Sequence, residues 1–485
     1  MIQRRAHARV SRRTFLAGAA GAGAASAVGW MAAAEPGGST AGLIPVGVAK
    51  IDATPDHPVR LPGYAGRKTE SEGVLQRLWA KALAIGGDDG DGPAVMLTLD
   101  NCGVPENVTE EVAARLKAKA GIRRERLVIC SSHTHTAPWL DGFLPLHYVE
   151  PIPPDHKERI RRYTRQATDW LEQAALRAIA SRAPGRLAWA QGRVGFAVNR
   201  RVLEDGKWVR IGVNPDGPVD HSLPLLRVTD ARGKLLAVVV NYACHCTTMS
   251  GNRIHGDWAG CAQQSIEEDQ PGAIALVTIG CGGDANPEPR SSVEATEAHG
   301  RAVADEVARL LAGPFVPLEQ APVARLQRIE LPFDTPPTAE EFAERLAAGR
   351  APKAGSRAKR LGYHAERMLD HIRRDGRVPE SLDYHVTAWA FGRELAMVFL
   401  PGEVVIDFTR RLKRELDGDR LWVTAYADDV PCYIPSRRVL SEGGYEADLA
   451  MISYARPTRF APAVEDRIVA AAKRLLPEGF DRAAG

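Results

Sequence analysis

Two short apolar runs that each lead into histidine constrain the fold of this chain more than any other feature. Residues 127–129 (LVI) lead into SSHTHT at 131–136, and residues 236–240 (LAVVV) lead into NYACH at 241–245. Short apolar runs of this kind are typical of buried strands. Because ligands commonly bind at the carboxyl ends of strands in α/β proteins, these histidines indicate a site on an α/β fold.

The histidines suit a metal site. Side chains alternate along a strand, so His133 and His135 are predicted to project to the same face, with Thr134 on the other. A hydrolytic zinc site needs about three protein ligands and one open position, and imidazole is a common ligand. His245 together with His133 or His135 would supply two ligands. The alternative for any one of them is a hydrogen-bonded core histidine.

The rest of the 485-residue chain alternates apolar and amphipathic segments without an internal repeat. This alternation predicts an α/β fold, a layered mixed sheet with flanking helices, rather than a β-sandwich. A Pro-rich and then strongly charged stretch predicts a helical insertion at about 335–380. Strands are expected at 47–51, 94–99, 127–130, 236–240, 273–279, 389–400 and 421–426, and helices at 109–119, 156–182, 293–311, 340–346, 357–374, 404–416 and 464–475.

The N-terminus is predicted to be a targeting segment. Ser11-Arg12-Arg13-Thr14-Phe15-Leu16 has the twin-arginine form, and an Ala/Gly-rich apolar stretch follows it. We therefore expect a signal peptide at 1–34, a linker at 35–42, a catalytic domain at 43–485, and a periplasmic or extracellular location. An uncleaved anchor is the alternative.

The net charge argues against nucleic acid as a partner. The formal charge of the whole chain is +3, and residues 1–34 carry five arginines and no acidic residue. Without that segment the formal charge becomes −2, so the basic balance belongs partly to the signal. Nothing in the remaining chain has the cationic footprint of a nucleic-acid-binding protein.

The seven cysteines do not form a zinc ribbon, because no CxxC pair exists. Cys244 and Cys246 flank His245, but on a strand their thiols would face away from the imidazole and pack as small apolar groups. The spacings leave one disulfide open without choosing its partners.

Three further stretches carry polar groups at places where a site would form. A glycine turn at 279–287 follows an apolar run, and its Asp284 is suited to orienting a histidine from behind. Glu403 lies between a predicted strand and a predicted helix, as a carboxylate ligand or simply as a favourable charge at a helix start. Tyr445, in the run GGYE, is either packing or a group near the metal.

In this order the motifs resemble the neutral/alkaline ceramidase family, specifically its N-terminal catalytic domain. The similarity runs from Pro62-Gly63-Tyr64 to Tyr445-Glu446 and is strongest at the His-Thr-His motif. The resemblance implies a zinc-dependent amidohydrolase of sphingolipid metabolism acting on a ceramide-like N-acyl bond. It implies the following zinc ligands: His133, His245, Glu403 and Tyr445. It also implies that His135 is a catalytic or substrate-binding histidine.

Two departures from the family pattern limit this resemblance. Asp284 matches the Asp of the family's Cys-Gly-Asp-Val-Ser-Pro-Asn motif, but Asn286 stands where that motif has its serine. Asparagine is not a nucleophile, although its amide can donate a hydrogen bond to an oxyanion. The family's C-terminal immunoglobulin-like domain is also not evident after the helix expected at 464–475.

These observations together predict hydrolysis by metal-activated water, with His135 moving the proton and Asn286 polarising the carbonyl. A catalytically inactive lipid- or glycan-binding homologue and a metal-dependent esterase are the alternatives, and a phosphoesterase is a weaker one. The substrate is expected to be small or lipid-like. Peripheral contact with a membrane and the oligomeric state stay open.

Overall fold

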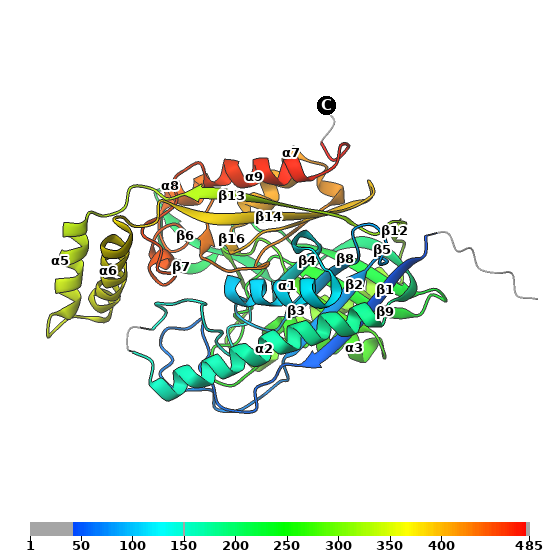
Figure 1. The fold of residues 1–485 in the computed structure, drawn as a ribbon, viewed down its shortest axis with the longest axis horizontal. Coiled ribbons are helices and arrows are strands. Elements are labelled where there is room, and N and C mark those ends of the chain that lie inside the picture. The colour runs from blue at the N-terminus through cyan, green and yellow to red at the C-terminus, as the bar shows by residue number, and fades with distance from the viewer. Residues whose placement is uncertain (1–41, 149–150, 482–485) are drawn as a thin grey trace, which may run out of the picture. The chain divides into compact units, whose positions relative to one another are not determined.

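The structure is a computed structural model that describes residues 42–148 and 151–481 (Figure 1). The predicted signal peptide and all but the last residue of the predicted linker lie outside the described residues. Among the described helices none is long and apolar enough to cross a membrane.

The largest sheet is mixed, and it carries the two histidine segments. Its strands follow the order β10-β9-β8-β5-β1-β2-β3-β4, and β12 pairs with β5. The pairs β3/β4 and β9/β10 are parallel, and the other pairs are antiparallel. The strands are β1 (Ile44–Asp52), β2 (Trp79–Ile85), β3 (Ala94–Leu99), β4 (Leu127–Ser131), β5 (Ala183–Arg193), β8 (Ser222–Asp230), β9 (Leu235–Tyr242), β10 (Ile274–Ile279) and β12 (Val316–Leu318).

The ends of this sheet approach each other, which brings the histidine segments together. Strands β10 and β4 lie at opposite ends of the strand order but contact each other. Beyond the strands, Thr134 forms a parallel bridge with Cys246, and the His135 N–H donates to the carbonyl of Cys246 at 3.2 Å. The curvature of the sheet therefore places the segments after β4 and β9 side by side.

Helices cover this sheet. The long helix α2 packs on β1, β2 and β3, and α1 packs on α2 (Figure 1). Tyr163, Leu171, Ala174 and Ala178 of α2 are fully buried at helical spacing, as the apolar periodicity predicts. The helices are α1 (Glu106–Ala120), α2 (Pro154–Ala180), α3 (Asp257–Asp269), which packs on β10, and α4 (Val293–Leu311), which packs on α3.

A second sheet, of order β13-β14-β15-β17, lies against α9 and is joined to the first sheet near the site. Cys130 of β4 forms an isolated bridge with Ala427, and the N–H of Ala425 donates to the carbonyl of Ile279 at 2.8 Å. The elements are β13 (Val323–Pro332), β14 (Ser381–Phe391), β15 (Leu395–Phe399), β17 (Leu421–Thr424), α7 (Asp407–Glu415) and α9 (Val464–Leu475).

Smaller elements complete the fold. Between β13 and β14 the chain forms the helical hairpin α5 (Ala339–Arg350) and α6 (Ser356–Asp375), at the left of Figure 1. Two small sheets have the orders β11-β6-β7 and β16-β18. Their strands are β6 (Ala197–Glu204), β7 (Lys207–Asn214), β11 (Ala285–Pro287), β16 (Glu403–Val404) and β18 (Tyr433–Ile434), and the remaining helices are α8 (Arg437–Glu442) and the 3-10 turns η1 (Arg124–Arg126), η2 (Gly418–Arg420) and η3 (Leu449–Ile452).

The layered mixed α/β fold with a helical insertion is confirmed, but several local expectations are corrected. The single strand expected at 389–400 is a hairpin, because the chain turns at Gly392, whose φ is +55°. The helix expected from residue 404 begins only at Asp407, so Glu403 lies in the short strand β16. Helix α3 and the β11-β6-β7 sheet were not expected from the sequence.

Candidate metal centre

His133 is held in a left-handed backbone conformation just beyond the end of β4. Its φ is +56°, which is uncommon for a residue other than glycine. Its Nδ1 lies 2.6 Å from the carbonyl oxygen of Cys102. A carbonyl only accepts, so Nδ1 carries the hydrogen and the Nε2 of the neutral ring keeps its lone pair.

The tautomer of His245 is fixed in the same way. Its Nδ1 donates to the carbonyl of Gly282 at 2.8 Å, so its Nε2 is the free acceptor. That contact needs glycine at 282, because a Cβ there would lie 2.6 Å from the backbone nitrogen of Cys244. Burial first, and then the charge of Arg200, lowers the pKa of His245 to about 3, which keeps the ring neutral.

Glu403 completes a set of three converging acceptors. Its Oε2 lies 3.0 Å from the Nε2 of His245 and 3.3 Å from the Nε2 of His133. All three residues are at most 4% exposed, so the two ring nitrogens and the carboxylate oxygen face one another away from water. A cation is the group that such a set fits.

A second set of possible ligands, Cys102 with His133 and His135, is less suited to a metal. Burial raises the pKa of the Cys102 thiol well above its ordinary value, whereas the thiolate is the form that binds metals. Cys244 and Cys246 are buried and free, as are all the other cysteines. The two histidines with Glu403 are therefore the better candidate.

His135 lies beside this set, as its position in the motif predicts. Its Nε2 is 3.1 Å from the Nε2 of His133, and the two rings are 4.7 Å apart. Strand alternation is not the cause, because β4 ends at Ser131 and the left-handed His133 turns the chain. The Nδ1 of His135 is buried, with no hydrogen-bond partner among the described residues. Burial, followed by the effect of His133, lowers the pKa of His135 well below its ordinary value.

Among the tyrosines, Tyr433 lies next to the ligand set. Its hydroxyl is 3.3 Å from the Nε2 of His245. Tyr445, the tyrosine that the resemblance implies as a ligand, packs its ring edge-on against Tyr433, with 5.5 Å between ring centroids. No hydrogen bond from the Tyr445 hydroxyl to a ligand appears in the described part of the chain. The hydroxyl of Tyr454 donates to the Oε1 of Glu403.

Arg200, on β6, is a site residue that sequence reasoning missed. Its guanidinium lies 3.0 Å from the Nε2 of His245, donates to the Tyr433 hydroxyl at 3.0 Å, and pairs with Glu446 at 2.8 Å. It is 4% exposed. The only sequence signal was a pair of arginines in an amphipathic stretch, because the carboxylate that balances Arg200 is more than 200 residues away.

The structure brings Asn286 to the site but leaves Asp284 behind it. The Oδ1 of Asn286 accepts from Arg200 Nη1 at 3.3 Å. Asp284 is fully buried, and its carboxylate accepts from the N–H of Ile406 at 2.9 Å and from the side chain of Asn199 at 3.1 Å. The two histidines are oriented by backbone carbonyls rather than by Asp284. Burial raises the pKa of Asp284 to about 6.

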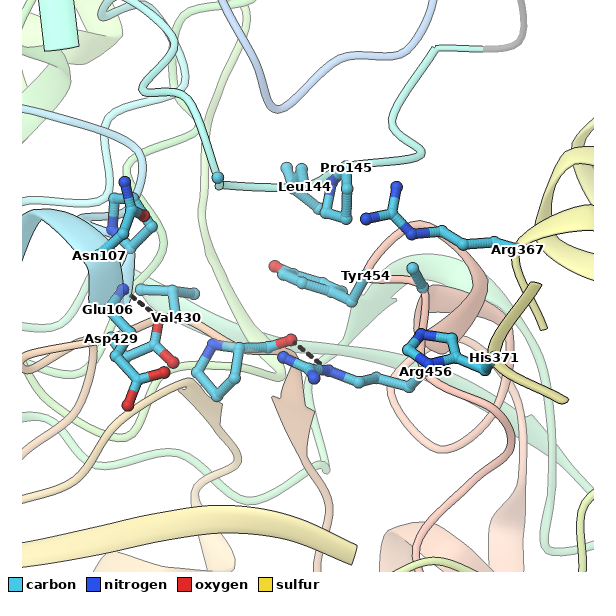
Figure 2. A pocket seen from close by; sticks show the side chains of 14 residues that line it. Glu106, Asn107, Leu144, Pro145, Arg367, His371, Asp429, Val430, Tyr454 and Arg456 are labelled. Atoms are coloured by element: carbon cyan, nitrogen blue, oxygen red, sulfur yellow. Dashed lines mark hydrogen bonds between the residues drawn. The ribbon is translucent and has the colours of Figure 1, made fainter. Parts of the chain in front are cut away.

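A polar pocket of about 320 Å³ is lined by Tyr454, the residue that donates to Glu403 (Figure 2). Tyr454 lies in its middle, and charged side chains of both signs surround it, including Glu106, Asp429, Arg367 and Arg456. Figure 2 shows Arg367 reaching toward Tyr454 from α6. The helical hairpin therefore forms one wall of this pocket.

Comparisons with known proteins agree on one family. The model for neutral/alkaline non-lysosomal ceramidase, N-terminal, matches residues 45–284. A neutral ceramidase of Pseudomonas aeruginosa is 27% identical over 229 residues, which are 46% of this chain and 33% of that protein. The matched region thus spans about a third of the length of this curated relative.

Solved structures extend the likeness across most of the chain. The crystal structure of neutral ceramidase from Pseudomonas aeruginosa matches with a TM-score of 0.64 at 19% identity, over 91% of this chain and 76% of that one. A structure described as ceramidase complexed with C2 matches with a TM-score of 0.65 at 18% identity, over 91% and 77%. The fold is therefore shared beyond the matched sequence region. Residues 45–284 therefore match the N-terminal domain of the neutral/alkaline non-lysosomal ceramidase family.

Proposed function

We propose that this protein is a zinc-dependent hydrolase that cleaves the amide bond of a lipid-like N-acyl compound. The observation that carries the proposal is that two histidine Nε2 atoms lie 3.0 and 3.3 Å from one carboxylate oxygen, with both Nδ1 atoms already donating to carbonyls. Zinc bound there would supply a Lewis acid and a water molecule of lowered pKa.

His133, His245 and Glu403 would hold the ion. The resemblance implies Tyr445 as a fourth ligand, whereas the 3.3 Å contact between Tyr433 and His245 supports Tyr433 in that role. Tyr445, one ring further out, would then face the substrate. The donation from Tyr454 to Glu403 fixes which oxygen of the carboxylate faces the histidines.

The remaining side chains would act on the substrate. His135 is neutral, and its Nε2 lies beside the ligands while its Nδ1 has no partner among the described residues, so it is suited to taking a proton from water and passing it to the leaving amine. Arg200 and the amide of Asn286 would donate to the carbonyl oxygen as negative charge develops on it. Because Asn286 cannot attack the carbonyl, the nucleophile would be water and no covalent intermediate would form.

The relatives support the substrate class. The curated relative is named neutral ceramidase, and a solved relative is described as complexed with C2. Ceramides are N-acyl compounds, which favours an amide over a phosphoester. A metal-dependent esterase would use the same residues, and a panel of N-acyl amides and matched esters would separate the two.

A second candidate function is a catalytically inactive homologue that binds a lipid or glycan. The observation that favours it is Asn286 at the position of the family's serine. Metal content would not decide between the two, since both would bind the ion. Metal-dependent turnover of at least one N-acyl substrate would decide for the enzyme.

The test of the proposed function is His133→Ala, measured for metal content and N-acyl-amide hydrolysis on the same samples. We expect about one zinc ion per chain in the parent protein, and loss of both metal and hydrolysis in the variant. His299→Gln is the matched control. His299 is a buried histidine on α4 that donates to the carbonyl of Pro289 at 2.7 Å, and glutamine keeps that donor. Full hydrolysis by a metal-free His133→Ala protein would contradict the proposal.

We also propose export by the twin-arginine route, which carries folded proteins and so suits a protein that acquires its metal before export. The support is the Ser-Arg-Arg-Thr-Phe-Leu run at 11–16. Replacing both Arg12 and Arg13 with lysine should leave the protein in the cytoplasm, as measured by fractionation of expressing cells.

A further inference from the structure

A second cavity, of about 330 Å³, lies between the loop at 60–68 and the start of α6. Its lining is cationic, and none of the described residues that line it is acidic. The charged side chains in the lining are Arg60, Arg67, Lys68, Lys359 and Arg360, and the ring of Tyr148 lies beside them.

The charge of Arg67 is buried, and no carboxylate of the described residues pairs with it. Arg67 is 9% exposed, and its guanidinium donates to the carbonyls of Pro62 at 2.8 Å, His135 at 2.6 Å and Gly251 at 2.7 Å. Carbonyl oxygens satisfy N–H groups but bring no net negative charge. The Nε of Arg67 is buried and has no hydrogen-bond partner among the described residues. A buried cation of this kind is stabilised by an anion.

The other arginines of the cavity are similarly placed. Arg60 donates to the carbonyl of Arg67 and to the ring of His156, both at 3.1 Å. Glu70, an acidic residue of the same region, is already engaged by Arg159 at 2.6 Å. Arg360 forms no ion pair within the described ranges, and its Nε is buried without a partner.

The start of α6 adds to the positive electrostatic potential of the cavity. The first turn of this 20-residue helix contains no acidic residue, and its N-cap, Gly355, offers no side chain to the free N–H groups. Helix N-termini favour anions, because those N–H groups and the helix dipole point the same way. The helix start therefore adds to the positive charge of the arginines around the cavity rather than opposing it.

One residue, Arg67, links this cavity to the segment that carries His135. Arg67 lines the cavity and also holds the backbone carbonyl of His135. In the same loop Gly63 touches the His135 ring so closely that a Cβ there would lie 2.3 Å from its Nδ1. Arg67 and this loop therefore separate the cavity from the His135 ring by one layer of residues.

We propose that this cavity binds a carboxylate, sulfate or phosphate group of the substrate, so that the protein acts on anionic N-acyl compounds in preference to neutral ones. The proposal rests on the proposed hydrolase function and names its substrate class. Positive charge and N–H donors would recognise the anion, and carboxylate, sulfate and phosphate groups all accept such hydrogen bonds.

The test is calorimetric binding of two ligands that share one acyl chain, N-lauroylglycine and N-lauroylethanolamine. The first ends in a carboxylate and the second in a neutral hydroxyl. We expect the mature protein to bind N-lauroylglycine about tenfold more tightly, the size of one hydrogen bond to a charged group. Arg360→Glu should remove that preference. Arg414→Glu is the control, since Arg414 is an exposed arginine of α7 whose reversal changes the net charge equally.

The possible outcomes test the anion site and the proposed hydrolase function separately. Equal binding of both ligands overturns the anionic substrate even if amides are hydrolysed. A preference that depends on Arg360, without turnover of either ligand, upholds the anion site and contradicts the hydrolase. Inorganic phosphate is the third probe. If phosphate binds but does not compete with N-lauroylglycine, the cavity holds a free anion and the substrate proposal fails.

Discussion

At the scale of single residues, the partner of Nδ1 decides what each buried histidine can do. In His133 and His245 this atom donates to a carbonyl, so Nε2 is left as an acceptor for a metal. In His255 the same atom accepts from the N–H of Asp257 at 2.9 Å. That ring must stay neutral for a structural reason, and it has no role in the proposed chemistry.

His255 makes stability fall in mild acid. Burial lowers its pKa to about 4, from 6.5 in the unfolded chain. Above pH 6.5 neither state is protonated. As the pH falls from 6.5 to 4 the unfolded state binds a proton that the folded state does not bind, so the free energy of unfolding falls by roughly 2 to 3 kcal/mol. In His255→Asn the amide oxygen can take the place of Nδ1 but does not titrate.

The measurement is urea unfolding of the parent and His255→Asn at pH 7 and pH 4.5. The parent should lose more stability between the two pH values than the variant does. Equal losses would show that His255 does not cause the acid sensitivity.

Arg200 gives a second prediction at this scale. Lysine at 200 keeps the positive charge but cannot span His245, Tyr433 and Glu446 at once. We expect Arg200→Lys to lower kcat by about a hundredfold, the usual effect of losing a donor to the developing oxyanion. Steady-state kinetics on an N-acyl amide would measure it.

Arg201→Lys is the matched control for this variant. Arg201 pairs with the same Glu446, but it contacts none of the three ligands. Its replacement should therefore lower the unfolding midpoint while leaving kcat near the parent value. If Arg201→Lys lost activity as strongly as Arg200→Lys, the effect would be structural rather than catalytic.

At the scale of elements, local patterns predict strands and helices well but not what lies between them. The apolar runs before His133 and His245 are β4 and β9, and the 3.6-residue periodicity at 156–182 is α2. The meeting of these histidines with Glu403 could not be derived from local pattern, because it depends on curvature of the main sheet and on β16, a strand of two residues. Arg200 was missed for the same reason, since its partners are distant in sequence.

The loop at 60–68 tests this long-range positioning. Gly63 has a φ of +89°, and a Cβ there would lie 2.3 Å from the Nδ1 of His135. Gly63→Ala should displace the His135 ring and lower kcat by at least tenfold, the scale of a lost general base or acid, while the bound metal stays. Gly195→Ala is the control, because Gly195 has open space around it and an ordinary φ. Unchanged kcat in Gly63→Ala would mean that His135 is not used.

At the scale of the whole molecule, the metal would join parts of the chain that are far apart in sequence. His133 follows a strand of the main sheet, and Glu403 follows β15 of the second sheet. Without a metal, the buried Glu403 carboxylate faces two ring nitrogens, and of these only that of His245 accepts from Arg200, which disfavours the folded state. A ligand that binds only the folded state stabilises it by about 2.7 kcal/mol at a hundred times its Kd.

Removing the metal should therefore lower the thermal unfolding midpoint by several degrees, and restoring zinc should recover it. His133→Ala supplies the internal comparison. Having lost a ligand, it should melt at the same temperature with and without chelator, whereas His299→Gln should respond as the parent does. Because the ligands follow strands of both sheets, the chelated protein should lose protection from hydrogen exchange on the two sides of the centre together, at β4 and at β16. A chelator effect of equal size in His133→Ala would place the stabilising metal elsewhere in the molecule.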